Sequence, residues 1–277
     1  MNTIVPAVFF GMLVMLAGTL PRNLLFAANL RYGAGMPWAV PVVAVYLFCF
    51  WKYLQGAGPP PENAAWRRDG LRAFRVAGRT WFWSLVAGAL AIVALVLALR
   101  LANRFFALPV QTLPDLSHVP ASTVAALLVA AAPVAGVVEE AAFRGYMQGR
   151  IESAYGLPVA ILVTGTMFAV AHLDFTLALW PYYVAVAAIY GTVTHYAGSI
   201  LPAVVLHTAG NLYSNLDLWL HGRAEWQAAG AATGDAPVAQ SLALVAAMLA
   251  ALWAFVRLVR AAAPRRTGRA APSPPSS

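Results

Sequence analysis

Long runs of apolar residues occupy most of this sequence, and such runs leave a chain few ways to fold. A helix that crosses a membrane needs about 20 mostly apolar residues, because in hydrocarbon every backbone polar group must be satisfied within the segment. Eight stretches have or approach this character: 4–20, 36–54, 81–101, 122–138, 157–171, 175–196, 200–220 and 237–259. The pattern predicts an all-α, polytopic bundle of about eight transmembrane helices.

The low content of charged residues excludes other classes of protein. Charged residues make up 10% of the chain and the mean hydropathy is +0.70, whereas about 25% of the residues in an ordinary soluble domain are charged. A soluble globule, a disordered chain and a coiled coil are therefore excluded. The single cysteine, Cys49, lies within an apolar run, so neither an intrachain disulfide nor a zinc–thiolate site can form.

The positions of the basic residues predict the orientation in the membrane. The chain has 18 Lys and Arg against 10 Asp and Glu, and the basic residues lie between the apolar runs. Eight alternating crossings place both termini, residues 55–80 and Arg150 on the same side of the membrane. That side then carries twelve basic residues and the other side carries five. The remaining basic residue, Arg144, belongs to a motif described below. Because basic residues are enriched in cytoplasmic segments, we expect both termini in the cytoplasm, membrane lipid as a partner and no nucleic acid.

On this interpretation the chain divides into four parts. Residues 1–120 contain the N-terminal transmembrane helices and a basic cytoplasmic loop near 55–80. Residues 121–220 form a core, residues 221–260 contain a loop and the last transmembrane helix, and residues 261–277 form a disordered basic tail rich in Pro and Ser. Arginines in the loop recur at helical spacing, which is typical of a helix lying on anionic lipid, with a plain solvated loop as the alternative; they are Arg68, Arg72, Arg75 and Arg79.

Polar side chains inside the apolar runs are the candidates for function. An ionisable group in hydrocarbon costs about 2.5 to 3.5 kcal/mol on insertion scales, so a chain that keeps one there has a use for it. Three clusters qualify: Glu139 and Glu140 with Arg144, Phe168 with His172, and His207 with Asn211.

The first cluster contains two acids with different surroundings. Glu140 and Arg144 are spaced i,i+4 in the favourable order for an ion pair, whereas Glu139 projects about 100° away on the helix and has no such partner. We therefore expect Glu140 and Arg144 to form a structural pair and Glu139 to serve the chemistry.

Taken together, the clusters supply one unpaired carboxylate, two histidines and an amide. A carboxylate and a neutral imidazole can deprotonate water, while a second imidazole and an Asn amide can donate hydrogen bonds to an oxyanion. The same Glu139, His172 and His207 would equally make the three-ligand open site of a catalytic zinc, although the chain has no HExxH pair. Both readings remain open at this stage.

The ordered series of motifs resembles a known family. Glu139-Glu140-x-x-x-Arg144, Phe168-x-x-x-His172 and His207-x-x-x-Asn211 are similar to the three motifs of the CPBP intramembrane endopeptidases, which include the type II CAAX prenyl endopeptidases and the bacteriocin-processing Abi proteins. The resemblance covers about residues 133–215, and residues 196–202 are like a short turn found in many bacterial members.

The resemblance implies an eight-helix fold with a conical cavity, a catalytic core within residues 121–220, and hydrolysis of a peptide bond near the C-terminus of a membrane-associated substrate. It also implies that Glu139 and His172 activate water and that His207 and Asn211 stabilise the oxyanion. Glu140, Arg144 and Phe168 would support the site. Family members differ in whether a metal takes part, so no cofactor is assigned, and a zinc, if present, would be bound by Glu139, His172 and His207.

A second class of function stays open beside the protease. Some members of the family are not catalytic, and a buried Glu/His set could instead relay protons in a transporter, bind an ion, or persist in an immunity or scaffold protein. A composition heavy in Ala and Arg indicates a bacterial host and its inner membrane. In such a host a peptide precursor or a sorting signal suits the site better than a prenylated chain end, which is a eukaryotic substrate.

Overall fold

The structure, a computed structural model, describes residues 3–106, 108–109, 115–173, 177–222 and 238–263. This part of the chain is helical and contains no strand, which confirms the predicted all-α bundle. The elements are α1 (Ile4–Tyr32), α2 (Ala39–Leu54), η1 (Pro61–Asn63), α3 (Ala64–Leu71), α4 (Gly78–Phe105), α5 (Ala121–Glu139), the π-helical η2 (Glu140–Gln148), α6 (Gly149–Tyr155), α7 (Leu157–Ala171), α8 (Trp180–Ala197), α9 (Leu201–His221), α10 (Val238–Val259) and η4 (Arg260–Ala262).

Each of the eight predicted stretches corresponds to a long helix, but the number of membrane crossings remains a prediction. Among the described residues, four helices are long and apolar enough to span a bilayer: Ile4–Tyr32, Gly78–Phe105, Ala121–Tyr155 and Ala239–Ala262. Helices α2 and α7 are apolar but shorter. The first helix extends to Tyr32, well beyond residue 20, so Arg22 lies inside a helix and not in a loop.

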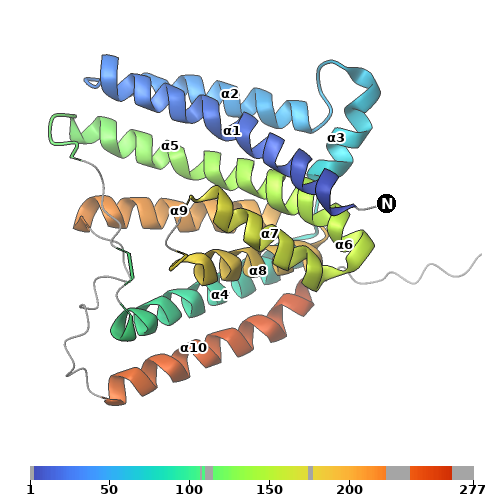
Figure 1. Cartoon of the computed structure of the whole chain (residues 1–277), viewed down its shortest axis with the longest axis vertical. Coiled ribbons are helices and arrows are strands. Elements are labelled where there is room, and N and C mark those ends of the chain that lie inside the picture. The colour runs from blue at the N-terminus through green and yellow to red at the C-terminus, as the bar shows by residue number, and fades with distance from the viewer. Residues whose placement is uncertain (1–2, 107, 110–114, 174–176, 223–237, 264–277) are drawn as a thin grey trace, which may run out of the picture.

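The long helices alternate in direction, which gives the bundle two distinct ends (Figure 1). We call one the basic end: α1 begins there, α3 lies there, and α6 and α10 end there. At the other, the opposite end, α1 ends and α5 and α10 begin. A hydrogen bond from Arg104 Nη1 to Ser241 Oγ (2.8 Å) joins α4 to α10 near the opposite end.

The basic segment between α2 and α4 differs from the predicted surface helix. Helix α3 ends at Leu71, and Arg72 adopts a left-handed conformation (φ 56°) at its C-terminus. The predicted arginine stripe is therefore wrong beyond Leu71, because Arg72 turns the chain away and Arg79 already belongs to α4. Tertiary contacts hold the segment instead: the Ile200 amide donates to the Arg72 carbonyl (3.1 Å) and Ser199 Oγ donates to the Phe74 carbonyl (2.8 Å).

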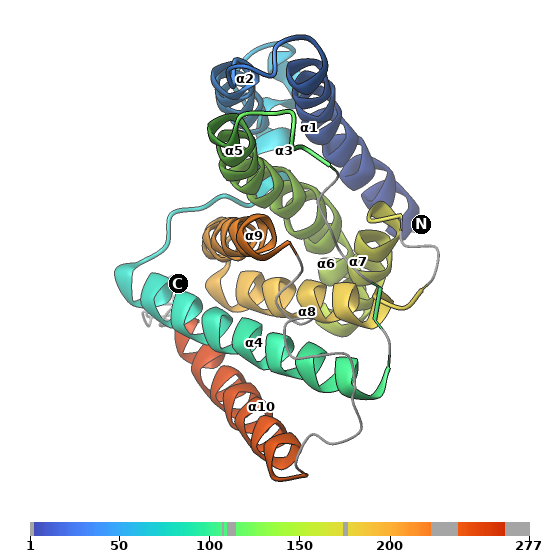
Figure 2. The same ribbon diagram turned by 90° about the vertical axis from the view of Figure 1, so that its left-hand side faces the viewer.

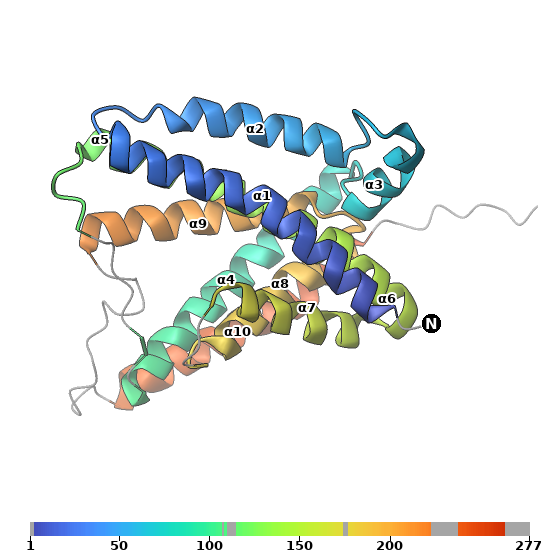
Figure 3. The same cartoon turned by 45° about the horizontal axis from the view of Figure 1, so that its top comes forward.

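The motif helices pack in the middle of the molecule. Helices α1, α2 and α5 form one side, α4 and α10 form the other, and α8 and α9 lie between them (Figures 2 and 3). Small residues allow close helix approach in a membrane, where apolar burial gives little drive for association. At Gly136 a Cβ atom would lie 2.2 Å from Thr208 Oγ1, so α5 and α9 touch through this glycine. The contact brings the end of α5 against the turn of α9 that carries His207.

Candidate active site

One cavity of about 160 Å³ collects the predicted catalytic residues. Glu139 at the end of α5, His172 just after α7, and His207 and Asn211 on α9 all line it, together with Phe168. The three motifs, separated by some thirty residues each in the chain, therefore meet around one space. Glu140 and Arg144 are not among the lining residues; they lie behind the cavity wall.

The residues behind the cavity wall form a buried network of hydrogen bonds. Arg144 Nη1 donates to Glu140 Oε1 (3.0 Å), and both side chains are fully buried. The same Glu140 oxygen lies 2.8 Å from His207 Nδ1. This segment is π-helical from Glu140 to Gln148, and π-helical turns within α-helices occur frequently at functional sites. The contact between Glu140 and His207 joins residues 67 positions apart, and no spacing in the sequence could have indicated it.

The bond to Glu140 fixes the tautomer of His207. A carboxylate only accepts, so Nδ1 carries the proton, and in the neutral ring Nε2 is an acceptor. Nε2 lies 3.6 Å from Glu139 Oε2, a buried atom that makes no hydrogen bond within the described part of the chain. Nε2 can act as a donor only when the ring carries a second proton.

His172 has the same arrangement of donor and acceptor as the neutral ring of His207. Its Nδ1 lies 2.8 Å from the Phe168 carbonyl, which only accepts, so Nδ1 is the donor. Nε2 of the neutral ring is then free to take a proton, as a general base requires. The ring is exposed and stacks on Tyr183, with centroids 4.2 Å apart.

Aromatic residues pack against both imidazoles, and two of them, Tyr183 and Tyr190, were not selected in the sequence analysis. Tyr183 stacks on His172, and Tyr190, seven residues later on α8, stacks on His207 with centroids 4.9 Å apart and an interplanar angle of 22°. Phe168 is almost completely buried and touches both histidine rings, at 4.6 Å and 6.3 Å between centroids. The spacing of seven places the two tyrosines on one helix face, and this spacing was the available signal.

Tyr190→Leu should lower turnover without unfolding the protein. Aromatic pairs contribute about 0.5 to 1.5 kcal/mol, so loss of the stack on His207 corresponds to a decrease of about 2- to 10-fold in kcat. Tyr190→Phe keeps the ring and should restore the rate. The exposed Tyr155 provides the control, Tyr155→Leu, and an equal loss in Phe and Leu variants at position 190 would contradict a role for stacking.

An aliphatic wall faces the polar residues. Helix α4 contributes it at i, i+3, i+4 and i+7 spacing, which is one helix face; the residues are Ile92, Leu95, Val96 and Leu99. These positions lie outside the three motifs, and in the sequence they could be recognised only as part of a membrane-spanning helix.

The donor set does not form a metal site in this geometry. Among the described residues, no three His, Cys, Asp or Glu side chains converge closely enough to hold an ion. Nδ1 of His207 is bound to Glu140, so Nε2 is the ring atom that would bind an ion, as in most metal-binding histidines. In this geometry Glu139, His172 and His207 lie too far apart to share one ion, and the mechanism below uses only groups of the chain.

Comparison with known proteins identifies the part of the chain that carries this site. Residues 121–213, about a third of the chain, match the family model described as "Type II CAAX prenyl endopeptidase Rce1-like". This segment is similar to the Rce1-like endopeptidases. The match supports the resemblance to the CPBP family, begins at the start of α5, and contains all three motifs described above. No curated protein and no solved structure matches the chain.

Proposed function

We propose that this integral membrane protein is an intramembrane endopeptidase that hydrolyses a peptide bond, near the C-terminus, of a membrane-associated protein or peptide. The observation that carries the proposal is the meeting of Glu139, His172, His207 and Asn211 around one cavity, all four within the segment similar to the Rce1-like endopeptidases. The family supports the reaction class, and the free acceptor and donor atoms support the division of roles.

In the proposed mechanism, water in the cavity attacks the carbonyl carbon of the substrate directly. Glu139 takes one proton from the water while Nε2 of His172 accepts a hydrogen bond from its second O–H group, and the proton on Glu139 then passes to the leaving amine as the C–N bond breaks. The Asn211 amide and the doubly protonated ring of His207 donate hydrogen bonds to the oxyanion. Glu140 holds His207 through Nδ1 and Arg144 holds Glu140, so these two residues position the donor without touching substrate.

Incubation of the purified protein with candidate membrane-anchored peptides tests the proposal. A new peptide terminus, detected by mass spectrometry and absent with Glu139→Gln, is the expected result. Failure to cleave any such peptide, together with uptake of protons or ions by proteoliposomes, would favour the transporter class instead.

Cleavage should survive removal of metal ions. His207 is paired at i,i+4 with Asn211, as an oxyanion donor would be. We expect elemental analysis to find less than one zinc per chain and chelation to leave the rate unchanged. Stoichiometric zinc whose removal abolishes cleavage, and whose return restores it, would make Glu139, His172 and His207 ligands.

We further propose that the protein lies in the inner membrane of a bacterium with both termini in the cytoplasm. Reporter fusions at Pro61 and at the C-terminal tail should then give cytoplasmic signals, because the basic residues gather on that side. The tail from residue 264 lies outside the described residues, so the fusion there tests a prediction from sequence alone. A non-cytoplasmic signal from either fusion would contradict the orientation.

A further inference from the structure

One arginine inside the bundle has no role in the mechanism above. Arg22 lies within the 29-residue helix α1, which is long and apolar enough to span a bilayer. Its side chain is half-buried, and its Nε atom is buried without a hydrogen bond in the described part of the chain. An arginine inside a membrane-spanning helix is costly, and such residues usually face the bundle interior and pair with another charge. Arg22 is therefore a candidate for a function that the three motifs do not contain.

Arg22 lies on the face of α1 that packs against α5 and the π-helical segment. A Cβ atom at Gly11 would lie 2.8 Å from Met147 Cε, and one at Gly18 would lie 2.4 Å from Val138 Cγ1. Arg22 follows Gly18 by four residues, about one helix turn, so the two residues share this face. Arg22 is thus placed beside the end of α5.

The side chains of Arg22 and Glu139 lean toward each other. Side chains tilt toward the N-terminus of their own helix, and α1 and α5 run in opposite directions (Figure 1). Arg22 therefore tilts back toward the level of Val138, and Glu139, the next residue, tilts toward the level of Arg22. The charge of Glu139 acts on Arg22, and such attraction is weakly screened where water is scarce.

Glu139 projects between α1 and α9. At 100° per residue, Gly136 and Val138 lie on nearly opposite faces of α5; Gly136 touches α9 and Val138 touches α1. Glu139 lies about 60° from Gly136 and about 100° from Val138, which is between these two faces. The carboxylate is thus flanked by His207 of α9 and by Arg22 of α1.

His207 and Arg22 compete for this carboxylate. Oε2 of Glu139 lies 3.6 Å from Nε2 of His207, beyond hydrogen-bond distance. In the proposed mechanism His207 carries a second proton, and a bond from Nε2 to Glu139 would then join the general base to the oxyanion donor. Neither group could serve the substrate while they were joined. A positive charge on the other side of Glu139 attracts the carboxylate and opposes this bond.

We propose that Arg22 is a positioning residue of the active site, and that it holds the Glu139 carboxylate apart from His207 so that base and donor stay available. The inference rests on the proposed endopeptidase function for the roles of Glu139 and His207. Because α1 lies outside residues 121–213, the active site would extend beyond the segment that matches the family model.

Substitution of Arg22 tests its effect on turnover. Arg22→Met keeps a long side chain but removes the charge, and it should lower kcat about 10- to 100-fold, the range of one charge interaction across the protein interior. KM should stay unchanged, because Arg22 does not line the cavity. Arg22→Lys returns the positive charge and should restore most of the lost rate.

A double-mutant cycle on thermal unfolding tests the attraction without requiring proteolysis. Arg22→Met is made in the wild type and in Glu139→Gln, and Tm is measured in detergent for all four proteins. Removing Arg22 leaves a carboxylate without a balancing charge only where Glu139 is present. The loss of Tm should therefore be larger in the wild type than in Glu139→Gln, whereas a residue that only packs would cost the same Tm in both.

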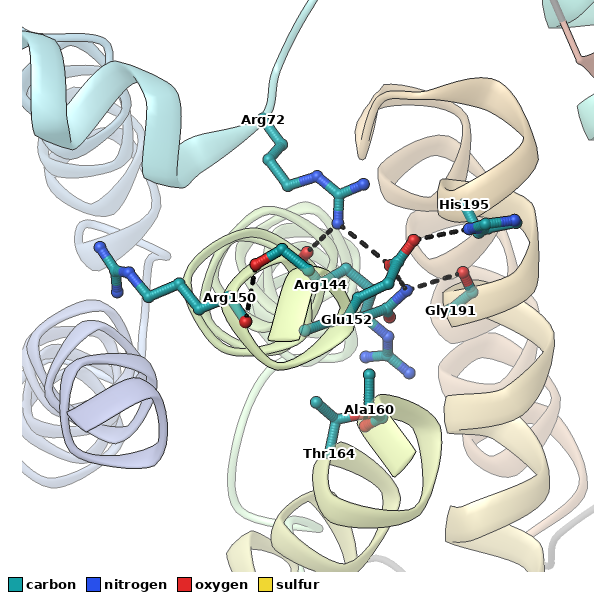
Figure 4. Close-up of polar contacts among 10 residues, drawn as sticks. Arg72, Arg144, Arg150, Glu152, Ala160, Thr164, Gly191 and His195 are labelled. Atoms are coloured by element: carbon teal, nitrogen blue, oxygen red, sulfur yellow. Dashed lines mark hydrogen bonds and ion pairs between the residues drawn. The ribbon is translucent and has the colours of Figure 1, made fainter. Parts of the chain in front are cut away.

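Arg150 provides the matched control. It is another half-buried arginine, and it lies at the basic end, where its Nη1 donates to the Tyr146 carbonyl (3.2 Å; Figure 4). Its guanidinium carbon also lies 4.5 Å from the centroid of the Trp66 ring. Any loss of Tm in Arg150→Met should be the same in the wild type and in Glu139→Gln.

Two outcomes would overturn the proposal. One is an equal loss of Tm for Arg22→Met in the wild type and in Glu139→Gln, and the other is a kcat that Arg22→Lys fails to restore. A larger loss in the wild type without cleavage of any peptide would support the attraction between Arg22 and Glu139 and count against the endopeptidase function alone.

Discussion

Glu139→Gln is expected to abolish nearly all cleavage, by about 100- to 10,000-fold, the range that general-base catalysis contributes. An amide of the same size cannot take a proton from water. Yield and Tm should stay at the wild-type level, because Oε2 of Glu139 makes no hydrogen bond in the described part of the chain and the side chain borders the cavity. Mass spectrometry of the cleaved peptide and thermal unfolding in detergent measure the two quantities.

The exposed Glu62 provides a matched control, since Glu62→Gln removes a carboxylate far from the cavity and should change neither quantity. Full activity in Glu139→Gln would remove the proposed mechanism. A large loss of Tm would instead show that Glu139 supports the fold.

Arg144→Ala and Glu140→Gln should mainly reduce stability, the former by about 3–5 kcal/mol, because removing one partner of a buried ion pair leaves the other charged and unpaired. Both side chains are fully buried and 3.0 Å apart. Glu140→Gln should also slow cleavage, because Glu140 holds the His207 ring in position through Nδ1. Yield, Tm and rate are measured for each variant.

A double variant distinguishes the contribution of the ion pair to stability from the cost of leaving one buried charge unpaired. Glu140→Leu with Arg144→Met removes both charges, so its loss of stability should be smaller than the sum of the two single losses. The opposite result is that Glu140→Gln abolishes cleavage without loss of stability while Glu139→Gln unfolds the protein. It would show that Glu140 is the general base and that Glu139 is the structural residue.

The helices were predictable because an apolar segment in a membrane must satisfy its backbone hydrogen bonds within itself, as an α-helix does. Residues 157–171 were predicted as a helix with the observed bounds, and α9 differs from its prediction by one residue at each end. The basic segment was not predictable in the same way, since Arg72 leaves the helix to bond with Ile200, far along the chain. Arginine spacing alone contains no information about that contact.

For the site, the sequence predicted candidate residues but not the contacts between them. Helical geometry indicated that Glu139 and Glu140 point in different directions. It also indicated that Glu140 and Arg144, spaced i,i+4, could form an ion pair. The link from Glu140 to His207 and the stacking of Tyr190 on His207 depend on how α5, α8 and α9 pack. The π-helical turns of η2 could not be predicted either, because an analysis of helical periodicity assumes the ordinary α-helical repeat.

The buried ion pair behind the cavity wall has a consequence for an energised membrane. Glu140 and Arg144 are fully buried near the middle of the 35-residue helix Ala121–Tyr155, so both charges lie within the electric field across the bilayer. One elementary charge that crosses the full potential gains about 2.3 kcal/mol per 100 mV. Glu140 and Arg144 carry opposite charges 3.0 Å apart, so the forces that the field exerts on them nearly cancel. Loss of one partner, as in Arg144→Ala, would leave a single charge on which the membrane potential can act.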